Sequence, residues 1–273
     1  MNNQLNTAKQ LFFNHFKEWK NLPYKIKKIN QGFTNSTYLI KINKQKYQIR
    51  IGDNNNIVDR VNEFNTLNNL KHSLYVFYDV NNGNSIKKWI EVNNLKHKII
   101  SYKIINLINQ EILLLHKTKI ENEILEFNPF VFYELSKNKL DIKYLELYTE
   151  LINKNKHLTK VLSHNDISLV NIIYHKNKVY LIDFEWTRLN NYYWDYANFI
   201  READLSLKKI KYWTKINNSL ELKTLIEFLY LTTCYAMQWT YATSENKKLI
   251  KYRKKTFKKL IKYHQYLELN SNE

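Results

Sequence analysis

Two polar residues in one short stretch, followed by an acid farther along the chain, have the types and spacing required for phosphoryl transfer. Asp166 is followed by four residues and then Asn171, and Asp183 comes twelve positions after that. Phosphoryl transfer requires a carboxylate that holds the acceptor hydroxyl, and oxygen ligands that hold Mg²⁺ against the phosphates. The spacing therefore predicts Asp166 as the catalytic residue that orients or deprotonates the hydroxyl. It predicts Asn171 and Asp183 as magnesium ligands.

Two short apolar strands are expected to position these residues. Residues 171–174 and 179–182 flank a polar turn at 175–178, which is typical of a compact hairpin. The loop before the hairpin would present Asp166, and the second strand would deliver Asp183 to the same end. Hairpin geometry would therefore bring together residues that are distant in the sequence.

Each residue taken alone also has an ordinary structural interpretation. A single Asp or Asn in an Asn-rich chain more often caps a helix or forms a turn, and His164 is expected to brace the loop from beneath. The joint pattern is His-x-Asp-x4-Asn, a hairpin, and an aliphatic pair before Asp-Phe. It resembles the catalytic and metal loops of protein kinases in order and separation. We therefore favour the functional interpretation of the set.

The segment from His164 to Glu202 is similar to the choline/ethanolamine kinase branch of the aminoglycoside-phosphotransferase-like superfamily. Glu185 stands where protein kinases carry Gly. The other positions in the family's register are Trp186, Asn190, Asp195, Ala197-Asn198-Phe199 and Glu202. The resemblance implies an ATP- and Mg²⁺-dependent kinase with a protein-kinase-like fold, in which Glu185 contacts a second metal ion or its water.

A turn near the amino terminus resembles the loop that covers the nucleotide phosphates in this family. It spans residues 31–36, where Gly32 would allow the backbone to approach a phosphate closely. The donors to phosphate oxygens would be Thr34, Asn35 and Ser36. Farther along, Ile90 and Glu91 would belong to the hinge that binds adenine through backbone groups and apolar contacts.

Arg50 and Glu63 are the charged pair that the resemblance implies for the nucleotide site. Arg50 takes the place of the phosphate-pairing lysine of protein kinases, and its planar fork suits phosphate oxygens. Glu63, on an expected helix, would be its ion-pair partner, and Asp59-Arg60 before it also resembles the family. The alternative is an ordinary surface pair.

Aromatic residues and one acid are candidates for the acceptor site. A quaternary ammonium makes no ordinary hydrogen bonds, so choline would require aromatic faces and a nearby carboxylate. The selected residues are Trp186, Glu202, Tyr235 and Trp239. Eukaryotic choline kinases carry two Trp three residues apart where this chain has Tyr235 and Gln238, and Leu207 stands at an expected aromatic position. The identity of the acceptor therefore stays open.

The period of the apolar residues divides the chain into two predicted parts. Residues 1–91 are expected to form an N-terminal lobe, a small antiparallel sheet with one inserted helix, and residues 92–273 a mainly helical C-terminal lobe. The expected strands are 36–42, 47–51, 74–80 and 85–90, with a hairpin turn at 81–83. The expected helices are 57–70, 104–115, 140–158 and two between 220 and 267. The predicted class is α+β, with the two-lobed architecture of protein kinases.

Composition and charge restrict the class of protein. The net charge of +18 raises nucleic acid or an anionic membrane as partners, but the lysines are scattered apart from a cluster between Lys247 and Lys262. A solvated surface is the favoured interpretation of that charge. The single cysteine, Cys234, excludes an internal disulfide and suggests a reducing compartment. Since no apolar run has the length of a membrane span, we expect a cytoplasmic protein.

Two other functions stay open at this stage. One is a related kinase for thiamine or an aminoglycoside, although the basic C-terminal half disfavours polycationic aminoglycosides. The other is a catalytically inactive basic protein that binds RNA or a membrane, against which the intact catalytic set argues. The favoured partner is a small amino alcohol, choline or ethanolamine, with no specific nucleic acid.

Overall fold

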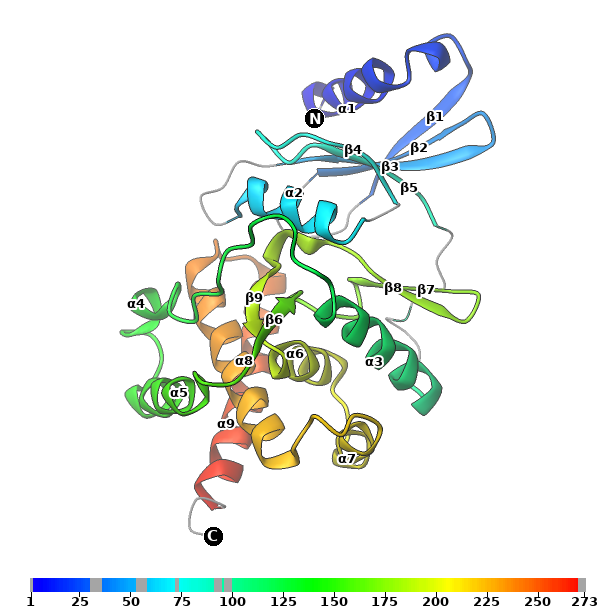
Figure 1. The fold of residues 1–273 in the computed structure, drawn as a ribbon. Coiled ribbons are helices and arrows are strands. Elements are labelled where there is room, and N and C mark those ends of the chain that lie inside the picture. The colour runs from blue at the N-terminus through cyan, green and yellow to red at the C-terminus, as the bar shows by residue number, and fades with distance from the viewer. Residues whose placement is uncertain are drawn as a thin grey trace.

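An antiparallel sheet at the N-terminal end and a group of helices at the C-terminal end make up the molecule (Figure 1). The structure is a computed structural model that describes residues 2–29, 36–52, 58–71, 74–90, 95 and 100–269. The predicted α+β class with a small antiparallel sheet is confirmed. The predicted boundary after residue 91 falls outside the described ranges and stays a prediction.

The N-terminal sheet has five strands in the order β1-β2-β3-β5-β4, and every neighbouring pair is antiparallel. Its strands are β1 (Tyr24–Ile29), β2 (Ser36–Ile42), β3 (Gln45–Ile51), β4 (Tyr75–Tyr78) and β5 (Ser85–Lys88). Sequence analysis did not predict β1, because its three lysines mask the alternation of apolar residues. Charged side chains are common on an edge strand, where they oppose pairing with another molecule.

The two faces of this sheet have different roles because successive side chains of a strand alternate between faces. Helix α1 (Asn2–His15), followed by the short η1 (Lys17–Trp19), covers one face, where the Phe12 ring lies 5.5 Å from that of Tyr47. Phe12, Ile40 and Ile49 are fully buried there. The opposite face carries Arg50 and is turned towards helix α2 (Arg60–Asn69).

Helix α2 is shorter than predicted and buries a different face. It begins after Asp59, whose side chain caps it by accepting a hydrogen bond from the Asn62 backbone N–H at 2.8 Å. Val61, one of the apolar residues at helical spacing in this segment, is 56% exposed. The buried side chains are mostly polar, namely Arg60, Asn62, Glu63, Thr66, Leu67 and Asn69. The apolar spacing failed here because polar partners lie across the interface with the C-terminal part.

The C-terminal part is built around helix α8 (Leu222–Ala242), which packs against α5 (Ile142–Asn155), α6 (Tyr193–Ala203) and α9 (Lys247–Leu269). Cys234 is buried within α8 as a free thiol. The remaining helices are α3 (Tyr102–His116), α4 (Tyr133–Ser136) and α7 (Leu207–Ile216). Among the described residues, we find no helix that combines the length and the apolar character of a membrane span.

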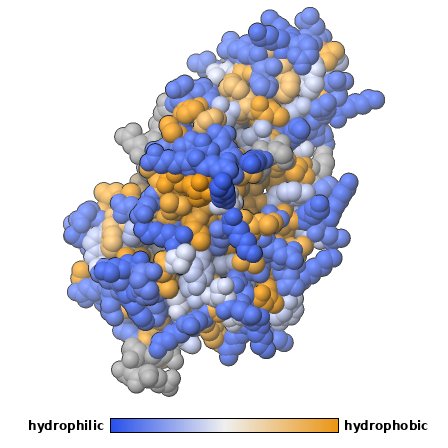
Figure 2. Space-filling model, in the orientation of Figure 1, coloured by the Kyte–Doolittle hydropathy of each residue, from blue (hydrophilic) through white to orange (hydrophobic). Residues whose placement is uncertain are grey.

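Two small two-stranded sheets in this part carry the candidate site. One pairs β6 (Lys160–Ser163) with β9 (Arg188–Asn191), and the other is the predicted hairpin of β7 (Ile172–His175) and β8 (Lys178–Leu181). A short 3₁₀ helix, η3 (Phe184–Trp186), follows β8. Polar residues cover most of the face seen in Figure 2, while apolar residues gather at mid-height, near the level of α2 in Figure 1.

Candidate active site

The candidate catalytic loop, between β6 and β7, is held in place by a buried acid on α6. The Asp195 carboxylate accepts hydrogen bonds from the backbone N–H of His164 at 2.9 Å and of Asn165 at 2.8 Å. His116 Nε2 lies 2.9 Å from the same carboxylate. Burial alone would raise the pKa of Asp195, but its hydrogen bond to His116 and the other donors lower it. The loop is therefore held by an ionised carboxylate.

Asn165 and His164 connect this loop to the segment after β8. Asn165 has a left-handed backbone with φ of 63°, which Asn tolerates better than most residues, and its Nδ2 donates to the Trp186 carbonyl at 3.0 Å. His164 Nδ1 accepts from the Asp166 backbone N–H at 3.3 Å, so Nε2 is the donor to the Ile182 carbonyl at 3.1 Å. Burial lowers the pKa of His164, which favours this neutral form. His164 thus has the bracing contacts expected from the sequence.

Asp166 lies where two other acids and burial oppose its ionisation. Its Oδ2 accepts a hydrogen bond from Asn171 Nδ2 at 2.8 Å, and the same Nδ2 lies 2.9 Å from the Asp166 carbonyl. Burial, followed by the charges of Glu202 and Asp183, raises the pKa of Asp166 to about 8. The hydrogen bond places Asn171 beside Asp166, and Asp183 lies near enough for its charge to raise the pKa of Asp166. The catalytic and metal-binding roles of the three residues stay predictions.

The oxygen donors at this end of the hairpin fit Mg²⁺ in kind. Asn171 Nδ2 donates to Asp166, so the Oδ1 atom of Asn171 is the one that would serve as a metal ligand. The Asp183 side chain is 41% exposed and follows β8 with a left-handed φ of 72°. Within the described residues, no three His, Cys, Asp or Glu side chains form a metal cluster. Two protein ligands suit Mg²⁺, which usually keeps several waters and phosphate oxygens.

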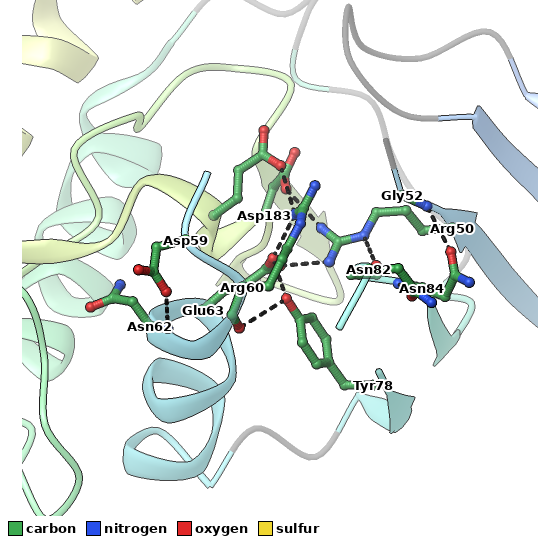
Figure 3. Close-up of polar contacts among 12 residues, drawn as sticks. Arg50, Gly52, Asp59, Arg60, Asn62, Glu63, Tyr78, Asn82, Asn84 and Asp183 are labelled. Atoms are coloured by element: carbon green, nitrogen blue, oxygen red, sulfur yellow. Dashed lines mark hydrogen bonds and ion pairs between the residues drawn. The ribbon is translucent and has the colours of Figure 1, made fainter. Parts of the chain in front are cut away.

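A buried ion-pair network connects the sheet, α2 and Asp183 (Figure 3). Arg50 Nη2 lies 2.8 Å from Glu63 Oε1, which is the predicted ion pair, and Arg50 Nη1 lies 3.7 Å from Asp183 Oδ1. The other Glu63 oxygen accepts from the Tyr78 hydroxyl at 2.6 Å and lies 2.9 Å from Arg60 Nη1. The Arg50 side chain is only 8% exposed, which rules out the ordinary surface pair.

The turn between β4 and β5 supports both arginines of this network. Arg50 Nε donates to the Gly83 carbonyl at 2.9 Å. Gly83 has φ of +72°, and a Cβ there would come within 2.5 Å of Arg60 Nε. The Asn81-Asn82-Gly83 turn expected from the sequence is present, with the Gly83 N–H bonded to the Asp79 carbonyl at 2.8 Å. Glycine is therefore required at position 83 by both backbone angle and space.

Glu185 has a different environment from Asp183. It is 6% exposed, and its Oε2 lies 3.5 Å from Arg60 Nη1. Burial, and then the charge of Asp183, raises its pKa to about 7. The geometry connects Glu185 to α2 through Arg60. Its contact with a second metal ion stays a prediction.

The four predicted acceptor-site residues fall into two groups. Trp186 and Tyr235 flank Phe132, with ring centroids 6.4 and 5.4 Å from it. Glu202 accepts from the Tyr252 hydroxyl at 2.7 Å, and the Trp239 ring lies 6.2 Å from the Tyr252 ring. Trp239 lies one helical turn after Tyr235 on α8, so one helix joins both groups.

Sequence analysis missed Arg201 and Tyr252, which both contact Glu202 of the second group. Arg201 is buried, with Nη2 3.0 Å from Glu202 Oε1 and Nη1 3.1 Å from the Tyr252 hydroxyl. Its charge also lowers the pKa of Asp166, against the larger effect of burial. No local signal identifies Tyr252, because it lies fifty positions from Glu202 and reaches it only through the packing of α9.

Lys87 on β5 is a third residue that the sequence reading missed. It pairs in register with Gln48 of β3, two positions before Arg50, and therefore lies on the same face of the sheet as Arg50. Its Nζ lies 5.6 Å from the Tyr75 ring centroid. Burial lowers the pKa of Lys87 to about 8, while Asp183 and Glu63 oppose that shift. Gln48 lies on the same face of β3 as Arg50, and Lys87 is its partner on β5. Alternation along β3 together with this pairing could have identified Lys87.

Several predicted nucleotide contacts lie outside the described residues. These are Gly32, Thr34, Asn35 and Glu91. Ser36 begins β2 on the sheet face opposite Arg50, and its hydroxyl donates to Gln4 of α1 at 2.9 Å. Its predicted bond to a phosphate stays a prediction. Ile90, just after β5, is partly buried.

Comparison with known proteins supplies a family and a fold. No protein-family model matches the sequence. The uncharacterized protein MG356 homolog of Mycoplasma pneumoniae is 30% identical over 246 residues, which cover 86% of this chain and 84% of that protein. Choline kinase LicA from Streptococcus pneumoniae has a similar structure, with a TM-score of 0.75, 17% identity, and coverage of 94% of this chain and 100% of that one. An ethanolamine kinase from Plasmodium vivax also has a similar structure, with a TM-score of 0.73 and 17% identity. That match covers 93% of this chain and 86% of the kinase.

Proposed function

We propose a kinase function from the premise that the chain belongs to the family of the MG356 homolog and has the fold of the choline and ethanolamine kinases within the protein-kinase-like superfamily. The proposed reaction transfers the γ-phosphoryl group of ATP to the hydroxyl of a small amino alcohol. Choline is the first candidate and ethanolamine the second. A cytoplasmic location and a role in phospholipid synthesis belong to the same proposal.

One observation carries this proposal. The Asp166 carboxylate, held by Asn171, lies in the electrostatic field of Asp183, and Asp183 in turn lies 3.7 Å from Arg50. The residues proposed as general base, oxygen ligand and phosphate-binding cation thus lie near one another, although they come from both parts of the chain. Structural ion pairs alone would not require the unfavourable burial of Asp166 beside two other acids.

Each residue of the proposed site would have a separate role in the reaction. Asp166 would accept a hydrogen bond from the acceptor hydroxyl and take its proton as the oxygen attacks the γ-phosphorus and the bond to the β,γ-bridging oxygen breaks. Arg50, oriented by Glu63 and the Gly83 carbonyl, would bind phosphate oxygens. Mg²⁺, held by Asn171 and Asp183, would supply charge neutralisation at the phosphates.

The acceptor would lie between the catalytic loop and helices α8 and α9. Glu202, 22% exposed on its side chain, is close enough to Asp166 to raise its pKa. The Trp239 and Tyr252 rings beside Glu202 supply aromatic faces of the kind that attract a quaternary ammonium. Choline is favoured for this reason. Thiamine and aminoglycosides remain alternatives that the experiment distinguishes.

The function is tested by measuring ATP consumption with choline, ethanolamine, thiamine and kanamycin, using Asp183→Asn as the blank. We expect turnover with choline or ethanolamine. Asp166→Ala should lower that turnover by about 100- to 10,000-fold, the usual contribution of a general base, while ATP affinity stays nearly unchanged by calorimetry. Turnover with only thiamine or kanamycin would overturn the acceptor assignment. Absence of turnover with all four would contradict the enzyme proposal.

A further inference from the structure

Helix α9 exposes an unusual density of positive charge along its outer face. Seven of its lysines are exposed, and we name them the α9 lysine face: Lys247, Lys248, Lys251, Lys254, Lys255, Lys258 and Lys262. Four of them, at 247, 251, 254 and 258, follow one another at intervals of four, three and four residues. That spacing places them in a single row along a helix, which at 23 residues is about 34 Å long.

The α9 lysine face has no carboxylate partners among the described residues. None of its lysines forms an ion pair, whereas Lys259 and Arg253, which are more buried, lie 3.1 Å from Asp204 and 2.6 Å from Glu245 respectively. The only acid within α9 is Glu268, near its end, which pairs with His264. Lys255 and Lys262 lie close enough to Asp204 for their charges to lower its pKa, and none of the other five lysines forms an ion pair with a described residue.

Exposed apolar side chains border the lysine row. Ile250 is 38% exposed and Phe257 37% exposed, and their positions place them together along one side of the row. Leu269, at the last position of the helix, is 79% exposed. Lysines alternating with exposed aliphatic and aromatic residues are the pattern of helices that lie on the surface of a membrane.

The opposite face of α9 fixes the helix to the rest of the molecule. Leu249, Thr256, Leu260 and His264 are buried, and the helix packs against α8. Its C-terminal end reaches the pole of the molecule opposite α1 (Figure 1). The lysine face is therefore a preformed surface that requires no folding to present its charge.

We propose that the α9 lysine face binds the surface of an anionic phospholipid bilayer. Each lysine close to such a surface strengthens binding about fivefold, and the flanking Ile250 and Phe257 would enter the interfacial region. Nucleic acid fits less well, because the face contains no arginine fork. Arg253, the one arginine of α9, turns inward to Thr240. This proposal does not depend on the kinase assignment.

Co-sedimentation with lipid vesicles tests the proposal directly. The full chain is mixed with vesicles of phosphatidylcholine alone or of equal parts phosphatidylcholine and phosphatidylglycerol. We expect binding to the anionic vesicles only, with loss at high salt. The triple substitution Lys251→Gln, Lys254→Gln and Lys258→Gln should lower the partition coefficient on the order of 100-fold.

A matched control distinguishes the effect of the α9 lysine face on binding from the effect of the total net charge. Helix α7 carries Lys208, Lys211 and Lys215, which are exposed and have the same three-and-four spacing. Substituting these three by Gln removes the same charge and should leave vesicle binding nearly unchanged. Ile250→Ser, which keeps the charge, should weaken binding several-fold.

Four results would overturn the proposal: no binding to anionic vesicles, equal binding to neutral vesicles, equal losses in the two triple variants, or tighter binding to duplex DNA or RNA than to vesicles at the same salt concentration. Circular dichroism and thermal unfolding verify that each variant is folded, so that a loss of binding reports on the surface.

Discussion

At Asp166, the ionised carboxyl that the proposed reaction requires lowers the stability of the folded protein. Its pKa in the folded protein is about 8, against a reference value of 3.8, because burial and the charges of Glu202 and Asp183 disfavour the ionised form. Between those two values the folded state binds the proton more tightly than the unfolded state. The stability that this carboxyl contributes below about pH 3.8 is therefore lost as the pH rises to about 8.

We predict that Asp166→Asn stabilises the protein in the absence of divalent ions. The gain in the free energy of unfolding should be small near about pH 4, should grow towards about pH 8 and should then level off, exceeding about 1 kcal/mol, the value of a single pKa unit. Urea unfolding across that range measures it. Glu146→Gln, an exposed acid on α5, is the control and should show no such trend. Lower stability of Asp166→Asn throughout the range would contradict the prediction.

At the scale of elements, the β4–β5 turn supports the proposed nucleotide site from the sheet side. Its carbonyl at Gly83 orients Arg50, and its Cα lies against the Arg60 guanidinium. The adjacent Gly52 has the same tight environment, because a Cβ there would lie 2.1 Å from the Asn82 carbonyl oxygen. Two of the chain's three glycines are thus placed where this turn meets β3.

We predict that Gly83→Ala destabilises the protein by about 1–3 kcal/mol, because a positive φ is strained for alanine and the methyl group displaces Arg60. ATP affinity should fall as well, since the Arg50–Glu63 pair loses its support. Denaturant unfolding and calorimetry measure the two effects. Asn81→Ala, an exposed position of the same turn, should change stability by less than about 0.5 kcal/mol. Equal effects of the two substitutions would refute this role for Gly83.

At the scale of the whole molecule, α2 is attached to the C-terminal part by buried amides. Asn62 Nδ2 donates to the Thr187 carbonyl at 2.7 Å, and its Oδ1 accepts from the Leu125 N–H at 2.8 Å. The Asn69 amide oxygen accepts from the N–H groups of Glu121 and Asn122 at 3.0 and 2.8 Å. The helix that carries Glu63 is therefore anchored across the boundary between the two parts.

We predict that Asn62→Ala costs about 2–4 kcal/mol of stability, because it leaves two buried backbone groups without partners. It should also reduce turnover, since Glu63 lies one position away on α2. The matched control is Asn65→Ala, whose amide makes a single exposed hydrogen bond, to Glu123 at 3.0 Å, and should cost less than about 0.5 kcal/mol. Thermal unfolding and the ATP assay measure both. A similar cost at the two positions would show that α2 is not anchored in this way.

The candidate catalytic set could be proposed from the sequence because its geometry is local. Asp166, Asn171 and Asp183 are separated by one loop and one hairpin, and hairpin register follows from strand and turn residues alone. The α+β class and the helices α3, α5, α8 and α9 were predictable for a similar reason, since apolar periodicity reports which face of an element is buried. Helices α1, α4, α6 and α7 were not predicted. The acid–base and metal-ligand hypotheses needed no knowledge of distant contacts.

Only the tertiary structure decided which polar side chains meet across long separations. Arg60 reaches Glu185, Asn62 reaches Thr187 and Tyr252 reaches Glu202, although no periodicity marks these pairs. Burial of a polar group becomes tolerable when a specific partner satisfies it, and that partner comes from another element. Apolar spacing therefore misassigned the buried face of α2, and the acceptor-site partners on α9 became visible only once the helices had packed.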